Sequence, residues 1–131
     1  MSITYNTRKD LPSEQLHKLF MSVSWSDGTE TSFMLKNFNM PFINSNIVIS
    51  AWENDYLVGC VRVLSDKIVR SVILDLAVTP EFQNQGIGKE LIRRPTIMSS
   101  HTIIADTHTL ANSAIGTPIL VINKEVINLA E

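Results

Sequence analysis

The chain has 131 residues, of which 44% are hydrophobic and 18% are charged. This length suits one domain, and five glycines and five prolines are too few for a collagen-like or a Pro/Gly-rich disordered chain. Eleven Lys and Arg against thirteen Asp and Glu give a net charge of −2, which excludes the overall basic excess typical of proteins that bind nucleic acid or anionic membranes.

The number of cysteines and the length of the apolar runs indicate the cellular compartment to expect. Cys60 is the only cysteine, which excludes an internal disulfide and, without a Cys/His cluster, a structural zinc site. The N-terminus has no apolar stretch of signal-peptide length, and no run reaches the roughly 18 apolar residues of a membrane span. We therefore expect a folded cytoplasmic protein with no metal, nucleic-acid or membrane partner.

The N-terminal part of the chain has strand and then helix character. A short strand is expected at residues 3–8. A helix follows over residues 14–23, where apolar side chains repeat with the spacing of one helix face, namely Leu16, Leu19, Phe20 and Val23. A weaker stripe through Phe33, Met34 and Phe38 predicts a second helix over residues 31–39, before Pro41.

From residue 46 the pattern becomes that of β-strands, with β-branched and apolar residues in runs. The expected elements are a hairpin of strands 47–52 and 56–63 with a turn at 53–55, a strand at 71–78, a loop at 81–85 and a helix over 86–94. Pro95 is expected to end that helix, because proline lacks the N–H that a helix interior needs.

The last 37 residues differ from the rest of the chain in composition. They contain no aromatic residue, and Asp106, Lys124, Glu125 and Glu131 are their only charges. Strands are expected at 102–105 and 119–122, and a helix or a strand at 125–129.

A glycine-containing loop joins the strand at 71–78 to the next helix, and its sequence is Gln83-Asn84-Gln85-Gly86-Ile87-Gly88. Backbone N–H groups at such a turn point outward at the positive end of the helix dipole, which favours a phosphate or a pyrophosphate. A Walker loop is excluded because Gly88-Lys89 is followed by Glu90 instead of Ser or Thr, and a dinucleotide fingerprint is excluded by Leu91.

Residues 74–91 resemble the acetyl-CoA motif of the GNAT superfamily of N-acetyltransferases. The motif core, Gln/Arg-x-x-Gly-x-Gly/Ala, is matched by Gln83, Gly86 and Gly88, after an apolar strand that ends near Pro80 and Phe82. The resemblance covers roughly residues 3–94 and leaves 95–131 as a divergent tail of one 131-residue domain. It implies an α+β fold, with a mainly antiparallel central sheet flanked by helices.

The resemblance implies acetyl-CoA as co-substrate. Backbone groups of Leu76, Ala77 and Val78 would pair with the pantetheine arm as though it were an added strand. The thioester carbonyl would lie by the strand end at Val78, where a backbone N–H would stabilise the oxyanion. The pyrophosphate would lie on backbone N–H groups of Gln83, Asn84, Gln85, Gly86, Ile87, Gly88 and Lys89. Lys89, Arg93 or Arg94 would reach the outer phosphates, or would form a solvated helix face.

The catalytic candidate is Asp75. An alkyl ammonium is mostly charged at pH 7, so attack on a thioester benefits from a nearby base. Asp75 is the only charge in the apolar run 71–78, although a structural carboxylate is an equally good interpretation. Glu53 and Glu30 are weaker alternatives.

Trp25 follows the first helix, where members of the resembling family form one wall of the acceptor site. Phe33 and Trp52 are further candidates for that wall, and for all three a place in the core is the main alternative. The acceptor would be a primary amine of a small molecule or a peptide.

The tail departs from the family pattern. It lacks the expected Gly-Phe turn, and no tyrosine follows Tyr56 to protonate the departing CoA thiolate. Two functions therefore remain open, a catalysing N-acetyltransferase and a non-catalytic CoA-binding module. The oligomeric state, monomer or homodimer, is also open.

Overall fold

The computed structural model describes residues 2–68, 70–98, 102–105, 119–123 and 126–129. Its strands are β1 (Thr4–Asn6), β2 (Ile47–Glu53), β3 (Tyr56–Ser65), β4 (Arg70–Val78), β5 (Thr102–Ala105), β6 (Ile119–Asn123) and β7 (Val126–Leu129). Its helices are α1 (Ser13–Ser22), α2 (Ser32–Lys36), α3 (Met40–Ile43) and α4 (Ile87–Met98), with a 3₁₀ turn at Pro80–Phe82. Among the described residues, no helix is long and apolar enough to cross a membrane.

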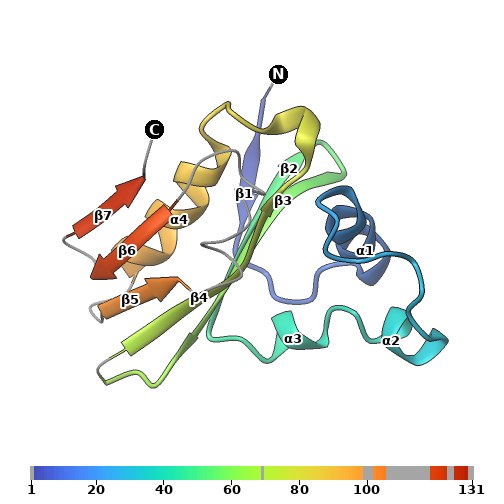
Figure 1. Cartoon of the computed structure of the whole chain (residues 1–131), viewed down its shortest axis with the longest axis horizontal. Helices are drawn as coiled ribbons and strands as arrows, with labels where there is room; N and C mark the ends of the chain where they lie inside the picture. The colour runs from blue at the N-terminus through green and yellow to red at the C-terminus, as the bar shows by residue number, and fades with distance from the viewer. Residues whose placement is uncertain (1, 69, 99–101, 106–118, 124–125, 130–131) are drawn as a thin grey trace.

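Strands β1 to β5 form one sheet in chain order, and β6 and β7 form a separate hairpin (Figure 1). The first four strands pair antiparallel, whereas β5 joins β4 in parallel. The predicted α+β fold with a mainly antiparallel sheet is confirmed. Parallel pairing occurs where the chain crosses over through α4, as parallel neighbours require.

Each face of the sheet is covered by its own helices. Helix α4 packs Ile87, Leu91 and Ile92 on one face, and α1 and α3 pack Leu16, Leu19 and Phe42 on the other. Figure 1 shows α1, α2 and α3 on one side of the central strands and α4 on the opposite side. Alternation along β3 and β4 supplies apolar side chains to both layers, so these two strands are buried on both sides.

The prediction for the second helix is wrong in its extent. Instead of one helix over 31–39, the chain forms α2 and then α3. Thr31 caps α2 by accepting a hydrogen bond from the backbone N–H of Met34, and α2 ends at Lys36. Pro41 lies in the first turn of α3, where its missing N–H costs nothing. Phe33, expected on an apolar stripe, is 75% exposed.

The prediction that Pro95 ends the last helix is also wrong. Helix α4 continues through Pro95 to Met98. Proline removes only one intrahelical hydrogen bond, the one to the carbonyl of Leu91, at a cost of about 3 kcal/mol. The Pro95 ring is buried beside the α4 face already packed on the sheet, and that packing offsets the loss.

The tail contributes one strand to the main sheet. β5 has the predicted bounds 102–105, and β6 and β7 occupy the runs expected at 119–122 and 125–129, the latter as a strand. Residues 106–118 lie outside the described residues.

Candidate acetyl-CoA site

Strand β4 contains a β-bulge at Asp75. In the register with β3, Cys60 lies opposite Ala77 and Arg62 lies opposite Leu74, so β4 carries one extra residue between these pairs. Asp75 has φ +53°, in the left-handed region that few non-glycine residues adopt, although Asp and Asn do so more readily than most. The bulge separates the two ends of β4 into different pairing environments.

Beyond the bulge, one edge of β4 has no strand partner among the described residues. The parallel register with β5 begins at Arg70 and ends at Ile73. The N–H of Thr79 donates to the carbonyl of Val58 in β3 at 2.8 Å. Because N–H groups alternate between the two edges of a strand, those of Leu76 and Val78 face away from β3, toward this edge.

Ala77 differs from its two neighbours in orientation. It lies opposite Cys60 of β3, so its backbone groups face the paired edge. The side-chain amide of Gln83 donates to the carbonyl of Val78 at 2.8 Å. The start of the loop is thereby tied to the open edge of β4, with the N–H of Val78 still directed outward.

The loop after β4 turns sharply twice before α4 begins. Asn84 has φ +64° and Gly86 has φ +89°. A Cβ built on Gly86 would meet no atom within 4 Å, so the space beside this glycine is open. The first hydrogen bond of α4 runs from the N–H of Glu90 to the carbonyl of Gly86 at 3.1 Å. The N–H groups that come before Glu90 in the first turn therefore precede the start of the regular hydrogen-bond ladder of α4.

Buried side chains hold this loop against the sheet. Phe82 and Ile87 lie in the core on the α4 face, one on each side of the turn. Gly88 is buried in the first turn of α4, whereas Asn84, Gln85, Gly86 and Lys89 are exposed. The backbone between the two anchors thus presents N–H groups at a helix N-terminus, an arrangement suited to an anion.

Helix α4 carries three basic residues, Lys89, Arg93 and Arg94. Glu90 holds Arg93 and Arg94 in hydrogen-bonded ion pairs of 2.5 Å and 2.8 Å, and the guanidinium of Arg94 also lies 4.2 Å from the ring centre of Tyr5. The hydrogen bond from Arg93 is the main cause that lowers the pKa of Glu90 to about 2. Lys89 is exposed in the first turn, nearest the loop.

Asp75 forms an ion pair that the sequence analysis did not identify. Its Oδ2 atom lies 2.5 Å from Nε of Arg62, and the two side chains are 24% and 18% exposed. The Sγ atom of Cys60 lies 3.5 Å from the carbonyl oxygen of Asp75. Burial is the main cause that raises the pKa of the Cys60 thiol. Cys60 is in a hydrophobic core, as expected for a small buried side chain.

The other two carboxylate candidates lie elsewhere. Glu30 accepts a hydrogen bond from Ser26 and contacts Nε2 of His17 at 3.0 Å. The hydrogen bond from Ser26 is the first cause that lowers its pKa. Glu53 is the last residue of β2, at the hairpin turn.

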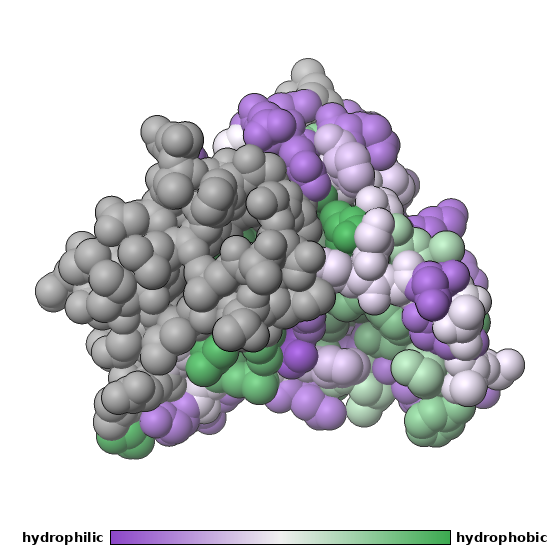
Figure 2. Space-filling model, in the orientation of Figure 1, coloured by the Kyte–Doolittle hydropathy of each residue, from purple (hydrophilic) through white to green (hydrophobic). Residues whose placement is uncertain are grey.

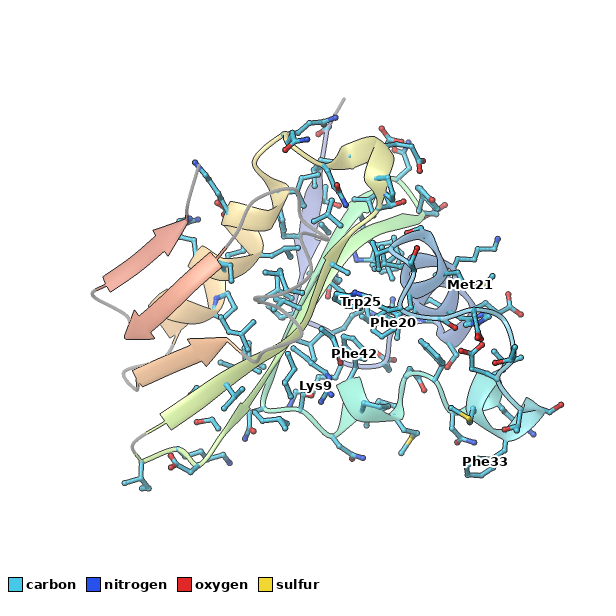
Figure 3. All side chains as sticks on the ribbon, viewed as in Figure 1. Lys9, Phe20, Met21, Trp25, Phe33 and Phe42 are labelled. Atoms are coloured by element: carbon cyan, nitrogen blue, oxygen red, sulfur yellow. The ribbon has the colours of Figure 1, made fainter. Side chains whose placement is uncertain are left out.

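Of the three aromatic candidates for an acceptor wall, Trp25 and Trp52 pack against the same core cluster, whereas Phe33 is exposed on α2. Trp25 packs edge-to-face on Phe20, with ring centres 5.4 Å apart, on the α1 face of the sheet. Figure 3 shows Phe20, Trp25 and Phe42 grouped beside the central strands, whereas Phe33 lies on α2, away from these strands. Trp52 donates its indole N–H to the hydroxyl of Ser50 at 2.8 Å.

Arg62 is the site residue that sequence reasoning missed. It is the only charge in the run 56–65, just as Asp75 is the only one in 71–78. Two lone opposite charges in strands that pair antiparallel are a detectable signal, because cross-strand neighbours of opposite charge attract. In the described part of the chain, no group of three or more His, Cys, Asp or Glu could hold a metal ion.

Comparisons with known proteins give the same family as the motif. A family model for the acetyltransferase (GNAT) domain matches residues 44–116, more than half of the chain and beyond residue 94 into the tail. The uncharacterized N-acetyltransferase ycf52 of Pyropia yezoensis is 31% identical over 96 residues, covering 70% of this chain and 52% of that protein. The chain spans about half the length of the curated relatives it matches.

Solved structures show the same fold. A GNAT-family acetyltransferase of Streptococcus pneumoniae TIGR4 matches with a TM-score of 0.65 and 22% identity, over 81% of this chain and 76% of that one. The PaiA N-acetyltransferase of Thermoplasma acidophilum, solved with coenzyme A, matches with a TM-score of 0.54 and 16% identity, over 75% and 72%. By family match, relatives and fold together, this chain belongs to the GNAT acetyltransferase family.

Proposed function

We propose that this chain binds acetyl-CoA and transfers its acetyl group to a primary amine of a small molecule or a peptide. One observation carries the proposal: the open edge of β4 leads directly into a loop of outward N–H groups at the start of α4. These two backbone surfaces suit the amide-rich pantetheine arm and the pyrophosphate. The coenzyme A bound to the Thermoplasma protein supports the choice of ligand.

The residues present fit coenzyme A. Gly86 has the positive φ and the open space that close approach of a phosphate needs. In the proposal, backbone N–H groups of the loop and the first turn from Asn84 onward hold the pyrophosphate, and Leu76 and Val78 pair with the pantetheine arm. The N–H of Gln83, expected in the same cradle, already donates to the carbonyl of Pro80 at 3.2 Å. Ala77 does not face the pantetheine arm in this proposal; its pairing with β3 holds the strand in place. Lys89, Arg93 and Arg94 are the candidate cations for the outer phosphates, and Lys89 lies in the first turn of α4, nearest the loop.

Acetyl-CoA would supply a thioester carbonyl, whose carbon is attacked by the amine nitrogen while the C–S bond breaks and CoA leaves as its thiolate, which takes up a proton from solvent. The N–H of Val78 is the proposed donor to the oxygen that becomes negative in the transition state. Asp75 is the proposed proton acceptor for the amine, with Oδ2 engaged by Arg62. Trp25 is the proposed side chain of the acceptor wall.

A CoA-binding module without turnover is the second candidate. The pairing of Asp75 with Arg62 favours it, since a carboxylate held by arginine already has a structural partner. The sequence also has no tyrosine after Tyr56 to act as acid. A thiol with a pKa near 8.5 is nevertheless a fair leaving group, so the missing acid weakens catalysis without forbidding it.

The proposal treats residues 1–131 as one acetyltransferase-like domain, active without metal in a reducing, cytoplasmic setting. Its test begins with calorimetric titration of the full chain with acetyl-CoA and with CoA. Thiol release is then followed over a panel of small amines and peptide N-termini. Binding with turnover supports the enzyme, binding without turnover on every amine supports the module, and no binding of either ligand rejects both.

A further inference from the structure

The bulge in β4 determines which side of the strand faces which layer. Before it, Ile73 points into the α4 core, and after it Leu76 does the same, three positions along instead of two or four. Without the extra residue, every side chain and N–H group beyond Leu74 would face the opposite way. The outward direction of the Leu76 and Val78 N–H groups therefore depends on Asp75 keeping its left-handed conformation.

Arg62 is the residue placed to hold Asp75 there. Its Nε atom pairs with Oδ2 of Asp75, and its Nη1 atom lies 3.4 Å from the hydroxyl of Ser45. The guanidinium carbon is 5.8 Å from the centre of the Phe42 ring. Ser45 is itself buried and donates to the carbonyl of Pro41 at 2.7 Å. The guanidinium is thus fixed from the end of α3 and fixes Asp75 in turn.

The bulge also lies where the sheet opens. Pairing of β4 with β5 ends at Ile73, two residues before Asp75. Loss of the bulge would extend the regular strand toward the open edge and change the groups offered there.

We propose that Arg62 is a positioning residue, whose ion pair with Asp75 holds the β4 bulge in the conformation that presents the N–H groups of Leu76 and Val78 to coenzyme A. The inference rests on the proposed function for its ligand. Arg62 itself contacts Asp75, Ser45 and Phe42 and acts on the site only through Asp75.

Variants of the two partners separate this role from that of a base. Arg62→Gln removes the charge, Arg62→Lys keeps the charge but loses the planar fork, and Asp75→Asn keeps a residue that tolerates positive φ. Arg8→Gln is the control, because it breaks an exposed ion pair with Asp10 away from the site.

The experiment measures CoA affinity by calorimetry, kcat and KM for acetyl-CoA, and amide hydrogen exchange at Ala77 and Thr79, for the full chain and each variant. We expect Arg62→Gln and Asp75→Asn to weaken CoA binding by about 5- to 50-fold, with Arg62→Lys between them and the original chain. The double variant should be no worse than either single variant, since both remove one interaction. The amide hydrogen-exchange rates of Ala77 and Thr79 should rise in the same variants that lose CoA affinity.

Two results would overturn the inference. One is Arg62→Gln with CoA affinity within twofold of the original chain and unchanged exchange. The other is a loss of kcat in Asp75→Asn that Arg62→Gln does not share, with CoA affinity intact in both, which assigns Asp75 to the base role alone. If Arg62→Gln does not unfold cooperatively, Arg62→Lys carries the comparison.

Failure of the proposed function is recognised separately. If the unaltered chain binds neither CoA nor acetyl-CoA, the proposed function is rejected. The exchange rates of Arg62→Gln then decide whether the pair holds the bulge, and unchanged rates reject that as well.

Discussion

The two halves of β4 have the same kind of sequence but different surroundings. Residues 71–73 are paired on both edges, with β3 and with β5, whereas residues 74–78 have β3 as their one strand partner in the described part of the chain. Both halves send apolar side chains into the α4 core, Ile73 from the first and Leu76 and Val78 from the second. The difference lies in the backbone groups left available, and it places the proposed ligand-binding edge inside an otherwise structural strand.

The largest expected effect comes from removing the partner of the paired half. A chain ending at residue 98 loses β5 and leaves the whole outer edge of β4 unpaired. An exposed, apolar central strand edge promotes association with other chains. We expect aggregation and loss of cooperative thermal unfolding, measured by size-exclusion chromatography and circular dichroism. A soluble, cooperative 1–98 chain would show that β5 is dispensable for the fold.

Next in size is a change at the end of the open half. Gly86→Val places a branched side chain at φ +89°, in the space proposed for the pyrophosphate. We expect CoA affinity to fall by about 100-fold or more in calorimetry. Gln85→Ala is the matched control and should change affinity by less than about threefold, because its backbone N–H is retained. Equal affinity in both variants would contradict a backbone cradle.

Core truncations on the two sides of the bulge sharpen the comparison further. Ile73 and Leu76 are both buried in the same cluster, so Ile73→Ala and Leu76→Ala should each lower the free energy of unfolding by about 2–5 kcal/mol. At temperatures below the melting transition, the CoA affinity of both variants should stay within about threefold of that of the unaltered chain, since the proposed contacts are with backbone. Urea denaturation and calorimetry check the two parts, and a large affinity loss at Ile73 alone would place the ligand on the paired half.

The smallest effect concerns acid stability at α4. The pKa of Glu90 is lowered from 4.5 to about 2 in the folded chain, chiefly by the hydrogen bond from Arg93. Its contribution to stability is therefore complete above pH 4.5 and is lost as the pH falls toward 2. Glu90→Gln should flatten the decline in the unfolding free energy over that window. A decline as steep as in the original chain would show that other carboxylates cause it.

The surface over α2 and α3 carries exposed apolar side chains. Phe33, Met34 and Met40 are among them. Figure 2 shows green apolar surface beside purple polar surface on the right-hand part of the molecule, where Figure 1 places α2. The apolar stripe predicted over 31–39 is present in the sequence, but Phe33 and Met34 are exposed, whereas Phe38 packs against the core on the α1 side of the sheet.

The sequence by itself determined the strands, the first helix, the fold class and the glycine loop. Those features depend on local periodicity and on residue types such as Gly86, whose turn only glycine adopts easily. It did not determine that α4 runs through Pro95, because buried packing outweighs one lost hydrogen bond only when the sheet is in place. Nor did it give the bulge at Asp75 and its pairing with Arg62, since register and cross-strand contact between residues 13 apart in sequence arise only when β3 and β4 are assembled.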